Sequence, residues 1–278
     1  MEMGARTFGP GELPRGPHGW IEAGVLLGDG VRLVFTNRLG GVSEPPFHAM
    51  NLGMKVGDDP SKVTENRERL ARYLGRDSGD FAFLEQVHGK RVVELGPGRS
   101  LDPVAWKRLR ASGYAYHRAD GAACPRPGPV LCVLTADCLP LALYHPRGAG
   151  ALLHAGWRGT IYNIAGHGVR SLCKMVKAEP GEVSAVIGPG IGPCCYRVDR
   201  ERARLFREVF GNSQGVVIEG RDGTFLDLRT ANLVNLQKAG VRPERIAVLD
   251  VCTCCREEYF SHRREGRTGR QGAFLLLY

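Results

Sequence analysis

Residues 130–160 read VLCVLTADCLPLALYHPRGAGALLHAGWRGT, and this stretch decides the fold. Apolar runs at 130–135, 139–144 and 151–154 have the length of buried strands and are separated by turn-forming or polar residues. Apolar residues then recur at helical spacing between 161 and 176. The stretch therefore predicts three neighbouring strands followed by a helix.

The rest of the chain mixes strands and helices in the same way. Asp59 caps and Pro60 opens a helix whose apolar stripe contains Val63, Leu70 and Leu74. The other expected helices cover residues 199–210 and 228–239, and the other expected strands cover residues 31–35, 81–87, 91–95, 183–187, 246–251 and 273–276. Because the two kinds of element are intermixed, we predict an α/β or α+β fold with mixed β-sheets.

Length and composition limit the class of protein. The chain has 278 residues, of which 43% are apolar and 24% charged, and these fractions exclude a disordered or fibrous chain. Residues 1–20 contain many glycines and prolines and are expected to form a loose tail. Residues 21–278 contain no repeat and no linker, so they predict a single domain. No apolar run approaches the roughly 20 residues of a membrane helix.

The cysteines and the N-terminal segment predict a cytoplasmic protein. The chain has nine cysteines, an odd number, which argues against a disulfide framework and for a reducing compartment. The first 20 residues lack the apolar core of a secretory signal.

The net charge of +9 raises the question of an anionic partner. The basic residues are spread along the chain, and their densest cluster, at 256–270, is interleaved with glutamates. No nucleic-acid-binding motif occurs in its required context. We therefore expect a solvated basic surface with one local anion site, and neither nucleic acid nor a membrane as partner.

Three segments place a metal-binding side chain at the end of an expected strand. They contribute His88, Cys138 and His154, and side chains at strand ends can converge on one pocket. Two histidines and one cysteine form the three-ligand set of a catalytic zinc site, in which the fourth position stays open. Gly156 and Gly159 allow close approach of the backbone, and the following helix offers free N–H groups to an anion. Each ligand taken alone is more often a structural residue.

Two short motifs contain five further cysteines, Cys194-Cys195 and Cys252-Thr-Cys254-Cys255. They could form a second metal site or a disulfide, but their spacings do not match a zinc knuckle, so we expect buried thiols. The glycine-rich loop at 188–192 lacks the spacing of a dinucleotide fingerprint and is interpreted as a turn-forming pocket loop.

Many ordered motifs show that the chain resembles the YfiH/YlmD-like family. These proteins are also called laccase-domain proteins, polyphenol oxidases, peptidoglycan editing factors or FAMIN-like purine nucleoside phosphorylases. The resemblance covers residues 21–278. The matching stretches are TNRLGGVS (36–43), MNLG (50–53), NR (66–67), QVHG (86–89), ADG (119–121), TADCLP (135–140), HAGWRGT (154–160), IGPGIGPCCY (187–196) and CTCC…YFSHRREGRTGRQ (252–271).

The resemblance implies a fold, a site and an activity. The fold is a layered sandwich of mixed β-sheets with outer helices, related to a group of cysteine hydrolases. The family's metal ligands fall on His88, Cys138 and His154, and Asn51 and Arg67 fall in its substrate or phosphate site. The implied activity is phosphorolysis of adenosine, inosine and methylthioadenosine to the base and a sugar 1-phosphate, together with deamination of adenosine. The expected cofactor is zinc, with copper as an alternative.

Guanidinium groups are suited to hold the inorganic phosphate through forked hydrogen bonds. Arg67 is the first candidate, and Arg158, Arg264 and Arg270 are further ones. Asp137, next to Cys138, is expected to act as a general acid or base for the purine or, with equal weight, to orient a ligand.

Three other functions compete with this one. A copper polyphenol oxidase needs several copper centres, and the chain lacks the paired His-x-His patterns that supply them. A cysteine hydrolase acting on a peptidoglycan precursor would use Cys138 as nucleophile and His154 as base. A metal-stabilised binding domain would unfold when the metal is removed, and it would have no turnover to lose.

Overall fold

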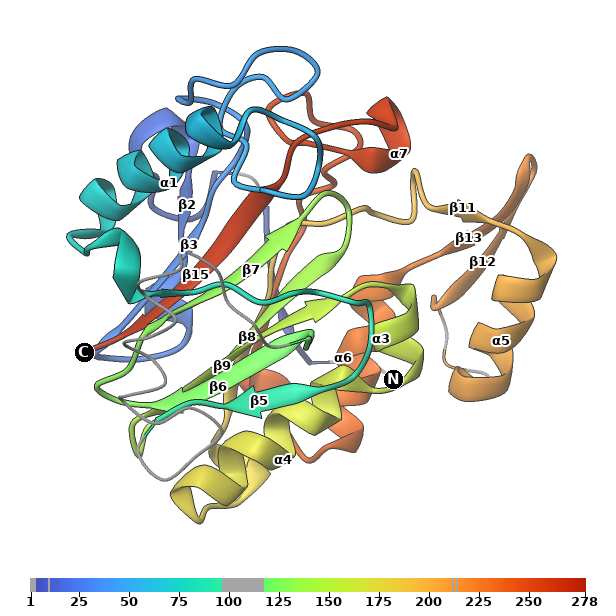
Figure 1. Ribbon diagram of the computed structural model, residues 1–278. Coiled ribbons are helices and arrows are strands. Elements are labelled where there is room, and N and C mark those ends of the chain that lie inside the picture. The colour runs from blue at the N-terminus through green and yellow to red at the C-terminus, as the bar shows by residue number, and fades with distance from the viewer. Residues whose placement is uncertain (1–3, 10, 97–117, 212, 214) are drawn as a thin grey trace.

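A seven-stranded mixed sheet forms one of the two central layers of the protein (Figure 1). The computed structural model describes residues 4–9, 11–96, 118–211, 213 and 215–278. In spatial order the strands of this large sheet are β1 (Arg6–Phe8), β14 (Ile246–Leu249), β10 (Ser184–Ile187), β8 (Leu139–His145), β9 (Ala149–Ala155), β6 (Gly121–Pro125) and β5 (Val92–Glu94).

A five-stranded sheet packs face to face on the large sheet. Its strands, in spatial order, are β2 (Ile21–Glu22), β3 (Val31–Phe35), β15 (Gln271–Leu277), β7 (Val130–Thr135) and β4 (Phe81–Ala82). Alternate residues of its strands, such as Leu33, Leu131 and Leu275, face Ala142 and Leu152 of the large sheet in one buried core. The other alternate residues of β15 and β7 are buried on the opposite face of the sheet, so these two strands are apolar on both sides.

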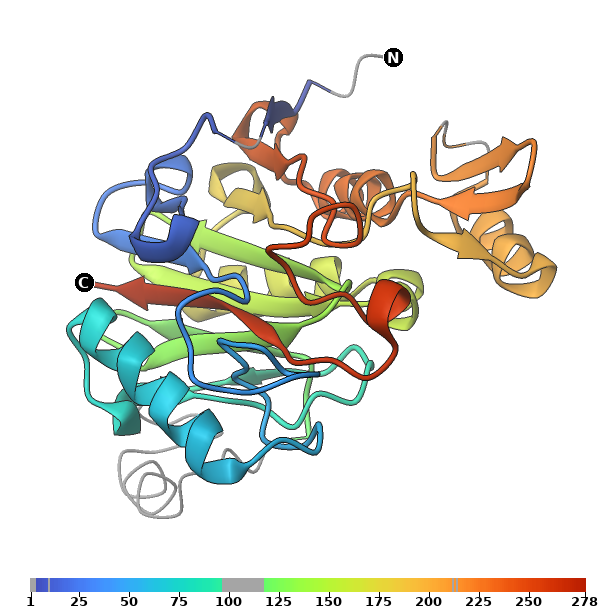
Figure 2. The ribbon, with the colours of Figure 1, turned by 90° about the horizontal axis from the view of Figure 1, so that it is seen from above.

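Helices cover the two outer faces (Figures 1 and 2). The helices are α1 (Pro60–Leu74), α3 (Trp157–Ile161), α4 (Ile164–Val176), α5 (Arg200–Phe210), α6 (Leu228–Lys238) and α7 (His262–Glu265). Leu70 and Leu74 of α1 pack on the five-stranded sheet, whereas α4 and α6 pack on the large sheet. The order helix, sheet, sheet, helix confirms the predicted layered sandwich of mixed sheets.

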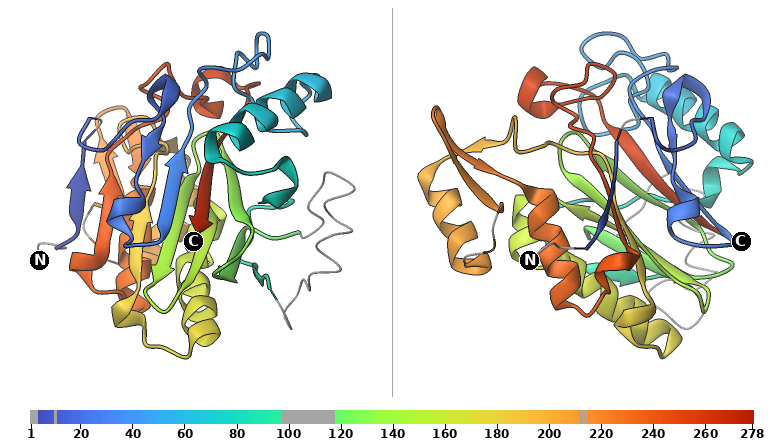
Figure 3. Two further views of the ribbon diagram at one scale, coloured as in Figure 1. Left: turned by 90° about the vertical axis from the view of Figure 1, so that its left-hand side faces the viewer. Right: turned by 180° about the vertical axis from the view of Figure 1, so that it is seen from behind.

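A small three-stranded sheet lies at one end of the molecule together with α5 (Figure 3). Its strands are β11 (Arg197–Val198), β13 (Gly223–Leu226) and β12 (Val217–Gly220). The remaining helical segments are 3-10 turns at Pro17–Gly19, Gly24–Leu26, Ser78–Asp80, Pro180–Glu182 and Pro243–Arg245.

Asp59 caps α1 as predicted, because its side chain accepts a hydrogen bond from the N–H of Ser61. The predicted helix over 161–176 begins earlier and is interrupted. Asn163 adopts a left-handed conformation (φ 56°) and caps α4 by accepting from the N–H of Gly166, so α3 and α4 are separate helices.

One other strand prediction is wrong. The strand expected over 81–87 ends at Ala82, and Gln86 instead pairs its side-chain amide with both backbone groups of Leu134 at 2.8 Å. The tail over 1–20 is not uniformly loose, because Arg6–Phe8 forms the edge strand β1 and pairs with β14. The segment at 99–118 has no clear sequence periodicity and is expected to be an excursion; except for Arg118, it lies outside the described residues.

None of the helices in the described part of the chain is long and apolar enough to cross a membrane.

Candidate metal and active site

The pairing of β8 with β9 brings two predicted ligands together at one edge of the large sheet. The strands run antiparallel, with Leu139 opposite Ala155 and Pro140 opposite His154. Cys138 directly precedes β8, and His154 is the second-to-last residue of β9. The start of one strand therefore lies beside the end of the other, and the two side chains meet there.

Asp120 orients His154. This aspartate directly precedes β6, which pairs with the other side of β9, and it is fully buried. Its Oδ1 lies 2.9 Å from Nδ1 of His154. The backbone N–H groups of Val87, His88 and Gly89 donate to the same carboxylate at 3.2, 2.8 and 2.6 Å. Because Nδ1 is bonded to the carboxylate, Nε2 of His154 is the nitrogen available to a metal ion.

His88 completes the set from the loop between β4 and β5. Its backbone is left-handed (φ 60°), a conformation that few residues other than glycine adopt and that functional sites often contain. Its ring lies 4.8 Å from that of His154 between centroids, at 75°. One ligand atom from each of His88, Cys138 and His154 lies within 4.8 Å of the other two. The fold thus gathers all three predicted ligands.

The charges of these groups support one another. Burial alone would raise the pKa of the Cys138 thiol, yet His154 and His88 lower it to about 6. Burial alone would lower the pKa of His154, but Cys138 and Asp120 raise it to about 9. Burial opposes ionisation of Asp120, while its hydrogen bonds from His154, Gly89 and His88 hold its pKa below the usual range. Without a metal ion, the charged forms of Cys138 and His154 therefore stabilise each other.

The donor set fits a metal ion of the zinc type. Two imidazoles and one thiolate are ligands that zinc prefers, and three protein ligands leave a position for water or substrate. His154 is buried and Cys138 half-buried, whereas His88 is exposed, so the set opens to solvent on the His88 side. A copper ion would also accept two histidines and one cysteine.

Gly156 leaves the space that the ligands occupy. A Cβ at this position would lie 2.9 Å from Sγ of Cys138 and 3.2 Å from Cδ2 of His88. Gly156→Ala is therefore expected to displace Cys138 and to lower zinc affinity at least tenfold, measured by competition with a chromophoric chelator. The control variant is Ala71→Gly on α1, which should bind zinc as the wild type does. An unchanged affinity in Gly156→Ala would contradict the packing described here.

Asp137 faces the C-terminal segment. One carboxylate oxygen accepts from Oγ1 of Thr253 at 2.8 Å and the other from the backbone N–H of Arg263 at 2.7 Å. Its backbone is left-handed (φ 93°). These contacts favour the interpretation in which Asp137 orients the adjacent Cys138 over the one in which it is an acid or base.

Asn51, Arg67 and Arg270 lie around one loop. Asn51 is fully buried, and its Oδ1 accepts from the N–H groups of Gly53 and Arg270, both at 2.9 Å. Arg67 donates through Nε and Nη2 to the carbonyl of Leu52 at 3.0 and 2.8 Å. Its guanidinium also lies 3.8 Å from the centroid of the Phe83 ring. Arg67 therefore holds the loop as well as carrying charge.

Arg270 links this loop to the metal-ligand set. Burial lowers the pKa of its guanidinium, and the charges of Cys138 and Asp137 oppose that effect. Its Nη1 donates to the carbonyls of Thr268 and Gly269 at 2.9 Å. Among the described residues, no carboxylate forms a salt bridge with Arg270, so its half-buried charge is available to an anion.

The other two candidate arginines make different contacts. Arg158 lies on α3 with its guanidinium 4.8 Å from the ring centroid of Trp157. Arg264 donates to the carbonyls of the 253–259 loop and to Glu265. Its hydrogen bonds are thus used to hold that loop.

The sequence reasoning missed two features. Asp120 lies in the quoted ADG motif, but nothing in the sequence tied it to His154, since that contact depends on the register between β6 and β9. The prediction of buried thiols is wrong for Cys194 and Cys255, which are exposed, and for Cys195, Cys252 and Cys254, which are partly exposed.

Known proteins resemble this chain along nearly all of its length. A family model described as multi-copper polyphenol oxidoreductase laccase matches residues 32–278. A protein of Geobacillus stearothermophilus named purine nucleoside phosphorylase YlmD is 36% identical over 92% of this chain and 94% of its own length. The Escherichia coli protein named purine nucleoside phosphorylase YfiH is 35% identical over 89% of this chain and 94% of its own.

Solved structures share the fold. The crystal structure of YlmD from Geobacillus stearothermophilus superposes with a TM-score of 0.85 at 35% identity and covers 95% of this chain and 98% of that one. The crystal structure of the Bacillus licheniformis protein YfiH superposes with a TM-score of 0.81 at 35% identity, over 89% of this chain and 93% of that one.

Proposed function

Since the chain belongs to the multi-copper polyphenol oxidoreductase laccase family, which includes the YfiH and YlmD proteins, we propose that it is a zinc-dependent purine nucleoside phosphorylase. The observation that carries the proposal is the convergence of His88, Cys138 and His154, with Asp120 behind His154, in a chain whose relatives are named phosphorylases. Adenosine, inosine and methylthioadenosine are the proposed substrates, together with inorganic phosphate. Deamination of adenosine is proposed as a second reaction of the same site.

The ligand set would hold the ion, and the surrounding residues would prepare the substrate. When bound, zinc supplies a Lewis acid that polarises a substrate group or lowers the pKa of a water molecule. Asp120 keeps the proton of His154 on Nδ1, and Asp137 holds the strand entry that carries Cys138. Arg270 would hold phosphate, whose oxygen forms a bond to the ribose C1′ as the bond from C1′ to the purine nitrogen breaks. The released base takes up a proton.

A single incubation tests the proposal. Purified protein, adenosine or inosine, and phosphate are followed by chromatography for the free base, inosine and ribose 1-phosphate, with and without chelator. Base and ribose 1-phosphate in equal amounts, lost on chelation and restored by zinc, support phosphorolysis. Base formed with free ribose, or no product at all, would reject it.

Arg270→Gln separates phosphate binding from metal binding. A charge-assisted hydrogen bond contributes about 1.5–3 kcal/mol, so we expect the KM for phosphate to rise about 10- to 100-fold while the zinc content stays at the wild-type level. Arg204→Gln, on the exposed face of α5, is the matched control. Unchanged phosphate dependence in Arg270→Gln would exclude Arg270 from the site.

Arg67→Ala is expected to keep metal and lose phosphorolysis, because the 51–53 loop loses its anchor.

A cysteine hydrolase is the second candidate, because Cys138, His154 and Asp120 also have the arrangement of a nucleophile, its base and an orienting acid. The second histidine beside the sulfur, His88, has no role in that mechanism. Turnover of a peptidoglycan-precursor amide that persists in chelator, with a covalent adduct on Cys138, would favour the hydrolase. Oxygen uptake with phenols and a blue protein would instead favour the copper oxidase.

A further inference from the structure

Two loops that follow parallel neighbouring strands meet at the carboxyl edge of the large sheet. β10 and β14 pair in parallel, and the pairing continues as a bridge between Gly190 and Cys252. The N–H of Gly190 donates to the carbonyl of Val251 at 3.2 Å, and that of Thr253 donates to the carbonyl of Gly190 at 3.1 Å. This register places the two cysteine motifs opposite each other.

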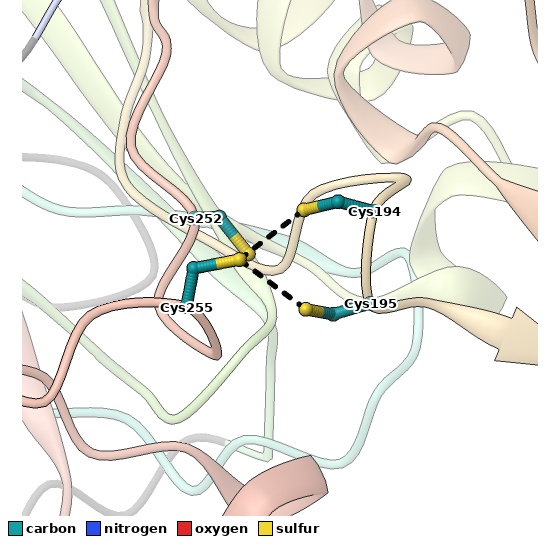
Figure 4. A group of neighbouring side chains, drawn as sticks. All are labelled: Cys194, Cys195, Cys252 and Cys255. Carbon is teal, nitrogen blue, oxygen red and sulfur yellow. Dashed lines mark hydrogen bonds between the residues drawn. The ribbon is translucent and has the colours of Figure 1, made fainter.

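Four cysteines from these loops point toward one common centre (Figure 4). Cys194 and Cys195 come from the loop after β10, and Cys252 and Cys255 from the loop after β14. Sγ of Cys255 lies 3.4 Å from Sγ of Cys194 and 3.4 Å from that of Cys195. All four sulfur atoms lie within 4.8 Å of one another.

These separations match a metal site better than a disulfide. A zinc ion with four sulfur ligands at about 2.3 Å requires sulfur atoms about 3.8 Å apart at the corners of a tetrahedron. A disulfide requires about 2.05 Å between two sulfurs, whereas Sγ of Cys255 lies at the same longer distance, 3.4 Å, from two different sulfurs. With all four sulfur atoms within 4.8 Å of one another, the set is compact enough to bind one ion.

The surroundings of the sulfurs also suit a thiolate site. The backbone N–H of Gly192 donates to Sγ of Cys252 at 3.2 Å. Three guanidinium groups donate hydrogen bonds to carbonyls of the same loops. Arg229 donates to the carbonyl of Gly190, and Arg263 donates to those of Cys195 and Arg197. Arg264 donates to the carbonyls of Thr253, Cys254 and Arg256. Four thiolates around a divalent cation carry a net charge of −2, which these nearby cations offset.

We propose that Cys194, Cys195, Cys252 and Cys255 bind a zinc ion in a second, four-thiolate site, separate from the set around His154. Four protein ligands leave no open position, so this site is structural. It would lock together the loop after β10 and the loop after β14. The locked loops carry the contacts that hold Asp137, namely the Thr253 hydroxyl on its carboxylate and the N–H of Ile191 on its carbonyl at 2.8 Å.

Zinc content tests the proposal without reference to turnover. Protein purified under reducing conditions with zinc should contain two zinc ions per chain by mass spectrometry of the metal. The double variant Cys194→Ser/Cys255→Ser should contain one, and so should His88→Ala/His154→Ala, which removes only the other site. Cys254→Ser, a substitution in the same loop outside the four ligands, should retain two. One ion in the wild type that the double cysteine variant also retains would overturn the second site.

The ligand set can be read directly in a protein that keeps these cysteines. X-ray absorption of zinc-loaded His88→Ala/His154→Ala should show about four sulfur neighbours at about 2.3 Å. Nitrogen or oxygen neighbours in place of sulfur would reject the proposal, as would a disulfide among the four cysteines in the reduced preparation. Loss of phosphorylase activity leaves this result unchanged, so the failure of the proposed function and the failure of the second site are distinguishable.

Discussion

Replacing Cys138 with alanine is expected to lower turnover by far more than 100-fold and to remove the ion held with His88 and His154. Loss of a group that merely supports a metal ligand already costs 10- to 100-fold in affinity or activity, and Cys138 is the only thiolate in this set. Two histidine ligands remain in Cys138→Ala, without the thiolate charge that attracts a cation. Zinc stoichiometry and the nucleoside assay, measured on the same preparation, check the prediction.

Cys173→Ala is the matched control for Cys138→Ala, because Cys173 is a buried cysteine on α4 outside both clusters. It should keep wild-type zinc and turnover. A Cys138→Ala protein that loses turnover but keeps both ions would show that Cys138 acts as a nucleophile. Wild-type turnover in Cys138→Ala would remove this residue from the site.

Replacing Asp120 with asparagine is expected to weaken zinc binding 10- to 100-fold and to destabilise the metal-free protein by about 3 kcal/mol or more. The carboxylate is fully buried and receives hydrogen bonds from His154 and from three consecutive backbone N–H groups, at 87–89. An amide presents a donor where one oxygen accepted, so at least one buried donor loses its partner. The segment that carries His88 then loses its anchor.

Urea unfolding of metal-free protein and zinc competition measure these two effects of Asp120→Asn separately. Asp222→Asn, in an exposed turn, is the control and should change neither quantity. The two effects have one cause, so they should appear together. A stable Asp120→Asn protein with wild-type zinc affinity would show that the hydrogen bonds to Asp120 do not organise the site.

The strand pattern explains which parts of the site were predictable. Cys138 and His154 flank the apolar runs that become β8 and β9, and neighbouring runs joined by a short turn pair with each other. Their proximity therefore follows from local sequence. His88 belongs to a loop that the sequence suggested was a strand up to residue 87, and its position depends on Asp120. The Asp120 contact requires the pairing of β6 with β9, which no local pattern specifies.

The same distinction applies to the arginines and the exposed cysteines. The sequence made Arg67 the first candidate and did not separate Arg264 from Arg270. In the structure, Arg264 binds the carbonyls of the 253–259 loop, whereas the charge of Arg270 interacts with those of Cys138 and Asp137. Cys194 and Cys255 are 61 residues apart, and only the parallel pairing of β10 with β14 brings them together.

The sequence by itself determined the mixed sheets, the cap of α1, the family resemblance and the choice of His88, Cys138 and His154 as candidate ligands. Those features rest on local periodicity, on single-residue backbone preferences and on motifs that occur in order along the chain. Tertiary structure alone decided that Asp120 supports His154, that the charge of Arg270 interacts with that of Cys138 and that four cysteines lie within 4.8 Å of one another. Each of these is a contact between segments that are separated in sequence and flank paired strands, and strand register is set by the packing of the whole core.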